Sequence, residues 1–217
     1  MQHGAPHPLT PELIVRAYAA GIFPMADSRD SDEIHWIDPQ QRGVFPLDGF
    51  HISRRLRRRI RRAPFEISFD QDFAGVVTGC AARDETWINA TIFDLYTQLF
   101  RAGFAHSIEV WKDDTLVGGV YGLAIGAAFF GESMFSTQTD ASKIALAYLI
   151  DRLRQGGFKL FDTQFITAHL ASLGAVEISR LRYHRRLTKA LETRADFHRA
   201  GPVPTPDQML QRMTQTS

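Results

Sequence analysis

The order of apolar segments between residues 107 and 165 constrains the fold of this chain more than any other feature. The stretch SIEVWKDDTLVGGVYGLAIGAAFFGESMF contains a strand, a polar turn at Lys112, Asp113 and Asp114, and a long β run dotted with glycines. This pattern predicts an antiparallel hairpin with a bend or a bulge. A helical segment, DASKIALAYLIDRLRQGG, and a strand, KLFDTQF, follow. Strand, strand, helix and strand in this order predict a mixed α/β sheet with its ligand at the strand ends.

Local signals predict the ends of this helix and the segments after it. Asp140 is placed to cap the helix at its N-terminus, and Gly156 and Gly157 to end it. The next stretch, HLASLGAVEISRLRYHRRL, is expected to form a loop or a turn of helix followed by a final helix or strand. The tail, GPVPTPDQMLQRMTQTS, has three prolines and little hydrophobic content, so we expect it to be loose.

Helix and strand signals also alternate in the first half of the chain. Thr10 can cap a helix that Gly21 ends, and the prolines, glycines and polar residues of 21–50 predict irregular structure. Apolar periodicity predicts further strands near residues 35–37, 43–45 and 65–69, and helices over residues 70–84 and 91–102.

A run of arginines concentrates positive charge in one short segment. Seven of the nine residues from 54 to 62 are arginine in a chain whose net charge is only +1, so the remaining residues are net negative. Ser53 can cap a short helix here, Leu56 and Ile60 give it an apolar stripe, and Pro64 stops it. Like charges at this spacing destabilise a helix, and phosphates would neutralise them. The segment therefore favours phosphate-backbone binding over a merely solvated face. The arginines are Arg54, Arg55, Arg57, Arg58, Arg59, Arg61 and Arg62.

Several classes of protein and site are excluded by what the sequence lacks. No run of eighteen apolar residues is present, and the first ten residues lack the pattern of a secretory signal, so we expect neither a membrane span nor export. The single Cys80 cannot form an internal disulfide or a CxxC site, which fits a reducing cytoplasm. The eight histidines lack HExxH and HxH spacing, and the glycines of GGVYGLAIG lack the lysine of a P-loop. We therefore expect no metal, nucleotide or cofactor.

Two short segments of the second half can carry chemistry. Glu132 in FFGESMFS is a lone carboxylate among aromatic and methionine side chains, so it is either desolvated for function or paired structurally. Asp162 and Gln164 in LFDTQF are two residues apart on a predicted strand and therefore share a face. They serve either a site or a hydrogen bond that closes a turn. A hydrolytic serine set around Ser172 is disfavoured, because this serine lacks the G-x-S-x-G elbow.

Several motifs together resemble those of a known family. They are AYAAGIFPM, HWIDPQQRGVF, HISRRLRR, TWI, GFAHSIEVW, LVGGVYG, FFGESMFS, ASKIAL, FDTQF and HLASLGA. In their order and near-matching spacing, over about residues 9–187, the chain resembles the leucyl/phenylalanyl-tRNA-protein transferases. The resemblance implies a small N-terminal domain with the basic helix, residues 1–63, and a catalytic domain with the acyl-CoA N-acyltransferase (GNAT-like) fold, residues 64–217.

The resemblance also implies an activity and its partners. The family transfers leucine or phenylalanine from aminoacyl-tRNA to the N-terminal Arg or Lys of a protein, which marks that protein for degradation. Methionine is a further candidate donor. The expected partners are therefore aminoacyl-tRNA and a protein or peptide with an N-terminal Arg or Lys, with no cofactor, and the chain is expected to be a cytoplasmic monomer.

Individual positions match the motifs of the family. Asp162 and Gln164 match its catalytic pair, with Asp162 orienting the Gln164 amide toward the attacking α-amine. Glu132 matches an acidic residue that would hold the ammonium or the cationic side chain of the acceptor. Trp87 matches the tryptophan that packs on the terminal adenosine, and Trp36 resembles another aromatic of the site. The aminoacyl pocket is expected at Phe129, Met134, Leu146, Leu149 and Phe161. The basic helix would bind tRNA phosphates without reading bases.

Departures from the family pattern and two alternative functions remain. Leu149 stands where an aromatic is expected, Phe161 where a smaller aliphatic is common, and Met25 where tryptophan often follows GIFP, so the preference between leucine and phenylalanine stays open.

An acyl-CoA-dependent N-acyltransferase would need a Q/R-x-x-G-x-G/A turn, which QTDASKIAL lacks. A non-enzymatic RNA-binding protein would leave the acidic and amide residues without a role.

Overall fold

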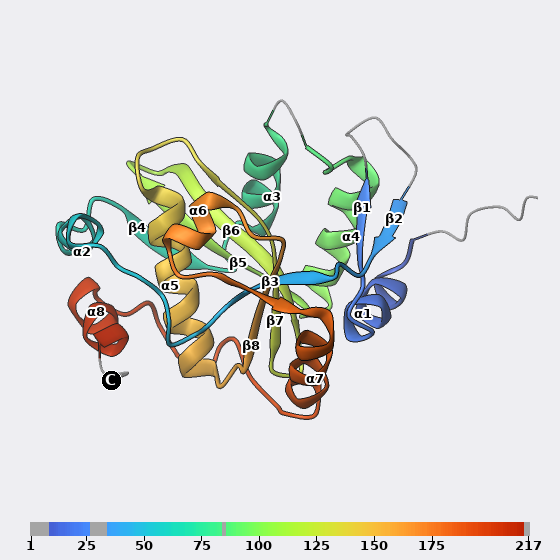
Figure 1. Ribbon diagram of the computed structural model, residues 1–217. Coiled ribbons are helices and arrows are strands. Elements are labelled where there is room, and N and C mark those ends of the chain that lie inside the picture. The colour runs from blue at the N-terminus through green and yellow to red at the C-terminus, as the bar shows by residue number, and fades with distance from the viewer. Residues whose placement is uncertain (1–8, 27–33, 84–85, 215–217) are drawn as a thin grey trace, which may run out of the picture.

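A seven-stranded sheet with the strand order β4-β5-β6-β7-β8-β3-β9 forms the centre of the protein (Figure 1). The computed structural model describes residues 9–26, 34–83 and 86–214. All neighbouring strands of this sheet are antiparallel except β7 and β8, and a second sheet pairs β1 with β2. The strands are β1 Phe23–Ala26, β2 Ile34–Ile37, β3 Gln41–Phe45, β4 Glu66–Phe69, β5 Ala105–Lys112, β6 Thr115–Ile125, β7 Ala128–Ser136, β8 Leu160–Gln164 and β9 Val176–Ser179. The prediction of a mixed α/β fold is confirmed.

Helices cover both faces of the large sheet (Figure 1). Apolar residues of α2, α5 and α8 form one buried cluster with it, and those of α1, α3, α4 and α7 form another. The helices are α1 Pro11–Ala19, α2 Arg54–Arg61, α3 Phe73–Ala81, α4 Ala90–Arg101, α5 Ala141–Gly156, α6 Ala168–Ser172, α7 Arg180–Leu191 and α8 Pro206–Thr214. Within the described ranges, no helix is long and apolar enough to cross a membrane.

The predicted hairpin is present, but the glycine-dotted run after it is two strands and not one. β5 and β6 pair around the turn at Asp113 and Asp114, both of which have positive φ. The chain then reverses at Gly126, whose φ of +57° suits glycine, and β7 returns antiparallel to β6. A side chain at Gly126 would also meet the Ala190 carbonyl at 2.9 Å.

Helix α5 connects the parallel strands β7 and β8, as the predicted strand, helix, strand order requires. Its end at Gly157, with φ +84°, is confirmed. The prediction that Asp140 caps its start is wrong: this residue has φ +67° and makes no capping bond. Its carboxylate instead lies 3.3 Å from Lys143 Nζ and 4.0 Å from Arg55 Nη2. The side chain therefore contacts these cations and not the helix N–H groups.

The C-terminal segment is more ordered than its composition predicts. The stretch after β8 forms α6, β9 and α7, so it contains both a strand and a helix. The prediction of a loose tail is wrong over residues 206–214, which form α8. Met209 and Leu210 are buried in the same cluster as α5, and the burial of these apolar side chains stabilises the docked helix.

Most N-terminal predictions hold where the structure describes the chain, but β1, Phe23–Ala26, is a strand in a stretch predicted to be irregular. Thr10 accepts the Leu13 N–H at the start of α1, Ser53 accepts the Leu56 N–H at the start of α2, and Leu56 and Ile60 are buried. The remaining predicted strands and helices correspond to β2, β3, β4, α3 and α4. Residues 27–33 of the segment predicted to be irregular, and residue 84, lie outside the described residues. β3 lies in the large sheet between β8 and β9, and the division of the chain at residue 63 stays a prediction.

Candidate active site

A cavity of about 530 Å³ lies where β1, β7, β8 and α6 meet, and its walls are mostly apolar. Phe23 and Met25 line it from β1, and Thr163, Gln164 and Phe165 from the end of β8 and the residue that follows. Further lining residues are Pro24, Arg83, Trp87, Val120, Gly131, Glu132, Ser133, Met134, Leu146, Phe161, Thr167, His169 and Leu170. A carboxylate and an amide thus stand in the wall of a largely apolar space.

Glu132 on β7 ends a chain of buried hydroxyl groups. Tyr96 of α4 donates to Glu132 Oε2 at 2.9 Å, and the Tyr96 hydroxyl lies 3.1 Å from that of Tyr18 on α1. Glu132 Oε1 is buried without a hydrogen-bond partner within the described part of the chain. Burial raises the pKa of Glu132 to about 7, although the hydroxyls of Tyr18 and Tyr96 favour its charged form. Near neutral pH this carboxylate therefore exchanges a proton readily and favours a cation.

Asp162 and Gln164 lie close together, but they meet differently from the sequence-based interpretation. Asp162 Oδ1 accepts the backbone N–H of Gln164 at 2.8 Å, whereas the interpretation places it against the side-chain amide. Asp162 is fully buried and does not line the cavity, while Gln164 does. Gln164 Nε2 is buried and has no hydrogen-bond partner in the described ranges. The amide, and not the carboxylate, is therefore the group that faces a bound molecule.

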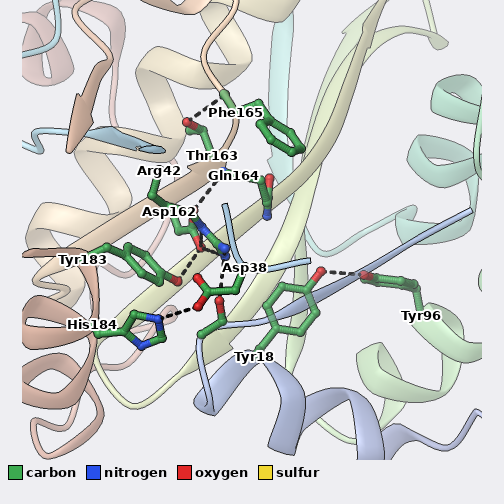
Figure 2. Close-up of polar contacts among 11 residues, drawn as sticks. Tyr18, Asp38, Arg42, Tyr96, Asp162, Thr163, Gln164, Phe165, Tyr183 and His184 are labelled. Atoms are coloured by element: carbon green, nitrogen blue, oxygen red, sulfur yellow. Dashed lines mark hydrogen bonds and ion pairs between the residues drawn. The ribbon is translucent and has the colours of Figure 1, made fainter. Parts of the chain in front are cut away.

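Arg42 and Tyr183 complete this cluster, and sequence reasoning missed both (Figure 2). Arg42 donates to Asp162 through Nε at 3.0 Å and Nη2 at 2.6 Å, and the Tyr183 hydroxyl donates to Asp162 at 2.7 Å. Burial is the largest single influence on the pKa of Arg42 and lowers it, but the hydrogen bonds to Asp162 and the negative charge of that carboxylate together raise the pKa above its usual value. Burial and Asp162 also raise the pKa of Tyr183. Arg42 belongs to the motif HWIDPQQRGVF, and no local signal there indicates that its partner is Asp162.

The five residues predicted for the aminoacyl pocket divide into two groups. Met134, Leu146 and Phe161 line the cavity. Phe129 and Leu149 do not, and both are 1% exposed within the core cluster. Phe129 packs edge-on against Phe161, with ring centroids 5.6 Å apart, so it supports a lining residue from behind.

The two tryptophans predicted to contact adenosine also lie in different places. Trp87, just before α4, lines the cavity and packs edge-on against Tyr96 with ring centroids 6.3 Å apart. Trp36 lies on β2, is 40% exposed and does not line the cavity. Only Trp87 is therefore placed to stack on a group bound in the cavity.

The arginines of α2 border a polar groove next to the cavity. A groove of about 530 Å³ is lined by Arg55, Lys143 and Ser172, and a smaller hollow by Arg55, Arg58, Arg59 and Arg62. Helix α6 separates groove from cavity, because Leu170 lines the cavity and Ser172 the groove. Two of the seven arginines have acidic partners among the described residues, Arg55 with Asp140 and Arg61 with Asp207. Most of the helix's charge thus remains available to an anion.

Three potential metal ligands come together away from the cavity. Asp70, His106 and His198 place one donor atom each within 4.8 Å of one another. His106 Nδ1 and Asp70 Oδ2 form a hydrogen bond at 2.7 Å, and His198 Nε2 lies at ion-pair distance, 3.2 Å, from the same oxygen, so contacts within the group account for the arrangement. Sequence spacing gave no sign of it, because the three residues come from distant segments.

The structure gives no support to thiol or serine chemistry at the residues considered above. Burial raises the pKa of Cys80 to about 12, so the thiol stays protonated. Ser172 donates to the backbone carbonyl of His169 at 2.7 Å and not to its ring.

The fold and the site define a class of protein: a mixed α/β protein with an apolar binding cavity that is lined by a carboxylate and an amide from two neighbouring central strands. The chain belongs to the leucyl/phenylalanyl-tRNA protein transferase family. The model of that family matches residues 44–188, and the model of the family's N-terminal domain matches residues 7–40.

Similar proteins support this assignment over nearly the whole chain. Two proteins named leucyl/phenylalanyl-tRNA–protein transferase, from two strains of Cereibacter sphaeroides, are 64% and 65% identical over 212 residues, which cover 98% of this chain and 99% of each relative. One with the same name from a Ruegeria species is 62% identical and covers 96% of this chain and 99% of its own. Among solved structures, FemX is similar at 11% identity and a TM-score of 0.48, covering 77% of this chain and 68% of its own.

Proposed function

We propose that this protein transfers leucine or phenylalanine from aminoacyl-tRNA to the N-terminal Arg or Lys of a protein. The observation that carries the proposal is the apolar cavity, whose lining includes Glu132, Gln164 and Trp87. An apolar aminoacyl side chain fits the lining of Met134 and Phe161, and polar side chains lose their hydration there. Membership of the family favours the same reaction.

In this reaction the α-amine of the acceptor attacks the ester carbonyl of the aminoacyl-tRNA. The amide bond forms, the ester C–O bond breaks, and the hydroxyl of the terminal adenosine leaves with a proton that originates from the amine. The Gln164 carbonyl accepts a hydrogen bond from the attacking amine and aligns it. Because the aminoacyl ester is already activated, alignment of the reactants supplies most of the rate.

Glu132 serves the cationic acceptor. Its Oε1, which has no hydrogen-bond partner among the described residues, and its pKa of about 7 suit a carboxylate that binds an ammonium or the cationic side chain of the acceptor N-terminus. A bound cation lowers the pKa of this carboxyl and favours its ionised form. Pairing with the cationic side chain is the arrangement that selects an N-terminal Arg or Lys.

The tRNA binds on two surfaces. The indole of Trp87 stacks on the terminal adenosine, which contributes about 1–3 kcal/mol. The arginines of α2 bind phosphates of the acceptor stem across α6 from the cavity. These contacts read no bases, so the cavity selects the amino acid.

The cellular setting belongs to the same proposal. The protein acts in the cytoplasm as a monomer, without a cofactor, and the added residue marks its target for degradation. Residues 1–63 form the smaller domain and residues 64–217 the catalytic domain with the N-acyltransferase-type core.

The test is transfer of radiolabelled leucine from Leu-tRNA to a protein with an N-terminal Arg, together with tRNA binding. Gln164→Ala is expected to lower transfer sharply while binding is retained. Gln98→Ala, on the exposed face of α4, is the matched control and is expected to leave transfer unchanged. A folded wild-type protein that binds tRNA and transfers nothing would contradict the proposal.

A further inference from the structure

The backbone at Gln164 adopts a conformation that a non-glycine residue rarely takes. Its φ is +55°, and the Phe165 N–H donates to the Thr163 carbonyl at 2.6 Å, so Gln164 is the central residue of a tight γ-turn (Figure 2). Such a conformation costs free energy and persists only where the surroundings impose it. This turn ends β8 and places Gln164 in the wall of the cavity.

The carboxylate of Asp162 stabilises the turn through a hydrogen bond to its backbone. Its Oδ1 accepts the Gln164 N–H at 2.8 Å, which would otherwise be a backbone donor in a buried place. A freely rotating aspartate would hold this N–H poorly. Asp162, however, is 0% exposed and accepts three further hydrogen bonds from Arg42 and one from Tyr183. These donors fix the orientation of its carboxylate.

Arg42 is itself held in one position. Its guanidinium lies between the rings of Phe23 and Tyr183, 4.6 Å and 4.4 Å from their centroids, and its Nη1 donates to the Gly21 carbonyl at 3.1 Å. Phe23 belongs to β1 and lines the cavity. The Arg42 side chain, which comes from β3, thus contacts two strands that line the cavity, β1 and β8.

The neighbouring residue on β3 leaves room for the turn. Gly43 pairs with Gln164, and a Cβ at Gly43 would lie 2.7 Å from the backbone carbon of Phe165. The strand that supplies Arg42 is therefore also shaped to lie against the γ-turn.

We propose that Arg42 and Tyr183 are positioning residues: they lock the Asp162 carboxylate, which in turn fixes the backbone turn that presents the Gln164 amide to the substrates. This role rests on the proposed transfer reaction. Asp162 then acts through the backbone of Gln164 and neither touches substrate nor carries a proton. The cluster keeps the amide aligned before the substrates arrive, so its effect is on the rate of the bound complex.

Two variants test the role. Tyr183→Phe removes only the hydroxyl that donates to Asp162, and Arg42→Lys keeps the charge but loses the forked contact. Tyr148→Phe, which alters a buried tyrosine on α5 outside the cavity lining, is the control. We expect Tyr183→Phe to lower kcat about ten-fold, with KM for aminoacyl-tRNA within about two-fold of wild type. The pH profile of transfer is expected to keep its shape, because no proton carrier is changed.

Amide hydrogen exchange gives a readout that does not depend on activity. The Gln164 N–H is expected to exchange slowly in wild type and in Tyr148→Phe, and at least ten-fold faster in Tyr183→Phe that remains folded. Four results would each overturn the positioning role in a variant that remains folded: a wild-type kcat, an effect on KM alone, a displaced pH profile, or an unchanged exchange rate of the Gln164 N–H. An active wild type with equally active variants contradicts this role alone, whereas an inactive wild type contradicts the proposed function as well.

Discussion

Glu132 is expected to make the stability of the protein fall as the pH rises toward neutrality, and Glu132→Gln to remove that fall. Burial raises the pKa of this carboxyl from 4.5 to about 7, so between these values the folded state binds more protons than the unfolded state. The contribution of Glu132 to the free energy of unfolding is therefore fully present below pH 4.5. It decreases as the pH rises and is lost once the pH passes about 7. At about 1.4 kcal/mol for each pH unit, the loss amounts to about 3 kcal/mol.

The Glu132→Gln substitution itself lowers the free energy of unfolding slightly. Tyr96 can still donate to the side-chain oxygen, but the new NH₂ group has no acceptor where Glu132 Oε1 now lies, which costs about 1 kcal/mol. At pH 8 the variant is therefore expected to be more stable than wild type by about 2 kcal/mol, and at low pH slightly less stable. For a chain of this size, the gain corresponds to a rise in Tm of about 4–8 °C.

Thermal unfolding of both proteins between about pH 4 and pH 8 measures this difference. Glu192→Gln, which neutralises an exposed carboxylate at the end of α7, is the control and is expected to follow the wild-type curve. Curves for Glu132→Gln and wild type that run parallel over the whole range would contradict the prediction, since they would mean that this carboxyl has the same pKa in the folded and unfolded states.

Three further predictions concern the tRNA surfaces and the C-terminal helix. Replacing Arg58 and Arg62 with alanine is expected to weaken tRNA binding and to reduce the slope of log K against log salt by about 2; an unchanged slope would argue against phosphate contacts. Trp87→Ala is expected to raise KM for aminoacyl-tRNA roughly ten-fold, whereas Trp36→Ala, on β2 outside the cavity, is expected to change it little; equal effects would contradict the assignment. Met209→Ala is expected to lower the free energy of unfolding by about 2–5 kcal/mol in a denaturant titration, and a loss under 1 kcal/mol would mean that α8 is not docked.

Local patterns were enough to predict much of the fold. The start of α2 followed from a serine before an apolar stripe, and the end of α5 from paired glycines, because caps and stripes depend on neighbours within a few residues. Two of the errors arose where contacts with distant residues determine the local structure. Asp140 is drawn to Arg55 as well as Lys143, and α8 is ordered by contact with α5, 50 or more residues earlier in the chain.

The site was predictable only in part for the same reason. The motifs located Glu132 and Gln164, which line the cavity, but the contacts that set their properties come from other segments. Arg42 is 120 residues from Asp162 in sequence, and an arginine after two glutamines gives no local sign of complete burial. Nor does strand periodicity indicate that β8 ends in a γ-turn, which changes how Asp162 and Gln164 meet.

The most direct test of the central claim is to incubate the protein with Leu-tRNA and a peptide that begins with Arg, and to identify the product by fragmentation mass spectrometry. The same peptide with an acetylated N-terminus, and leucyl-CoA in place of Leu-tRNA, serve as controls. Leucine is expected on the N-terminal Arg only when Leu-tRNA and the free amine are both present. A product made from leucyl-CoA, or no peptide product while tRNA remains bound, would contradict it.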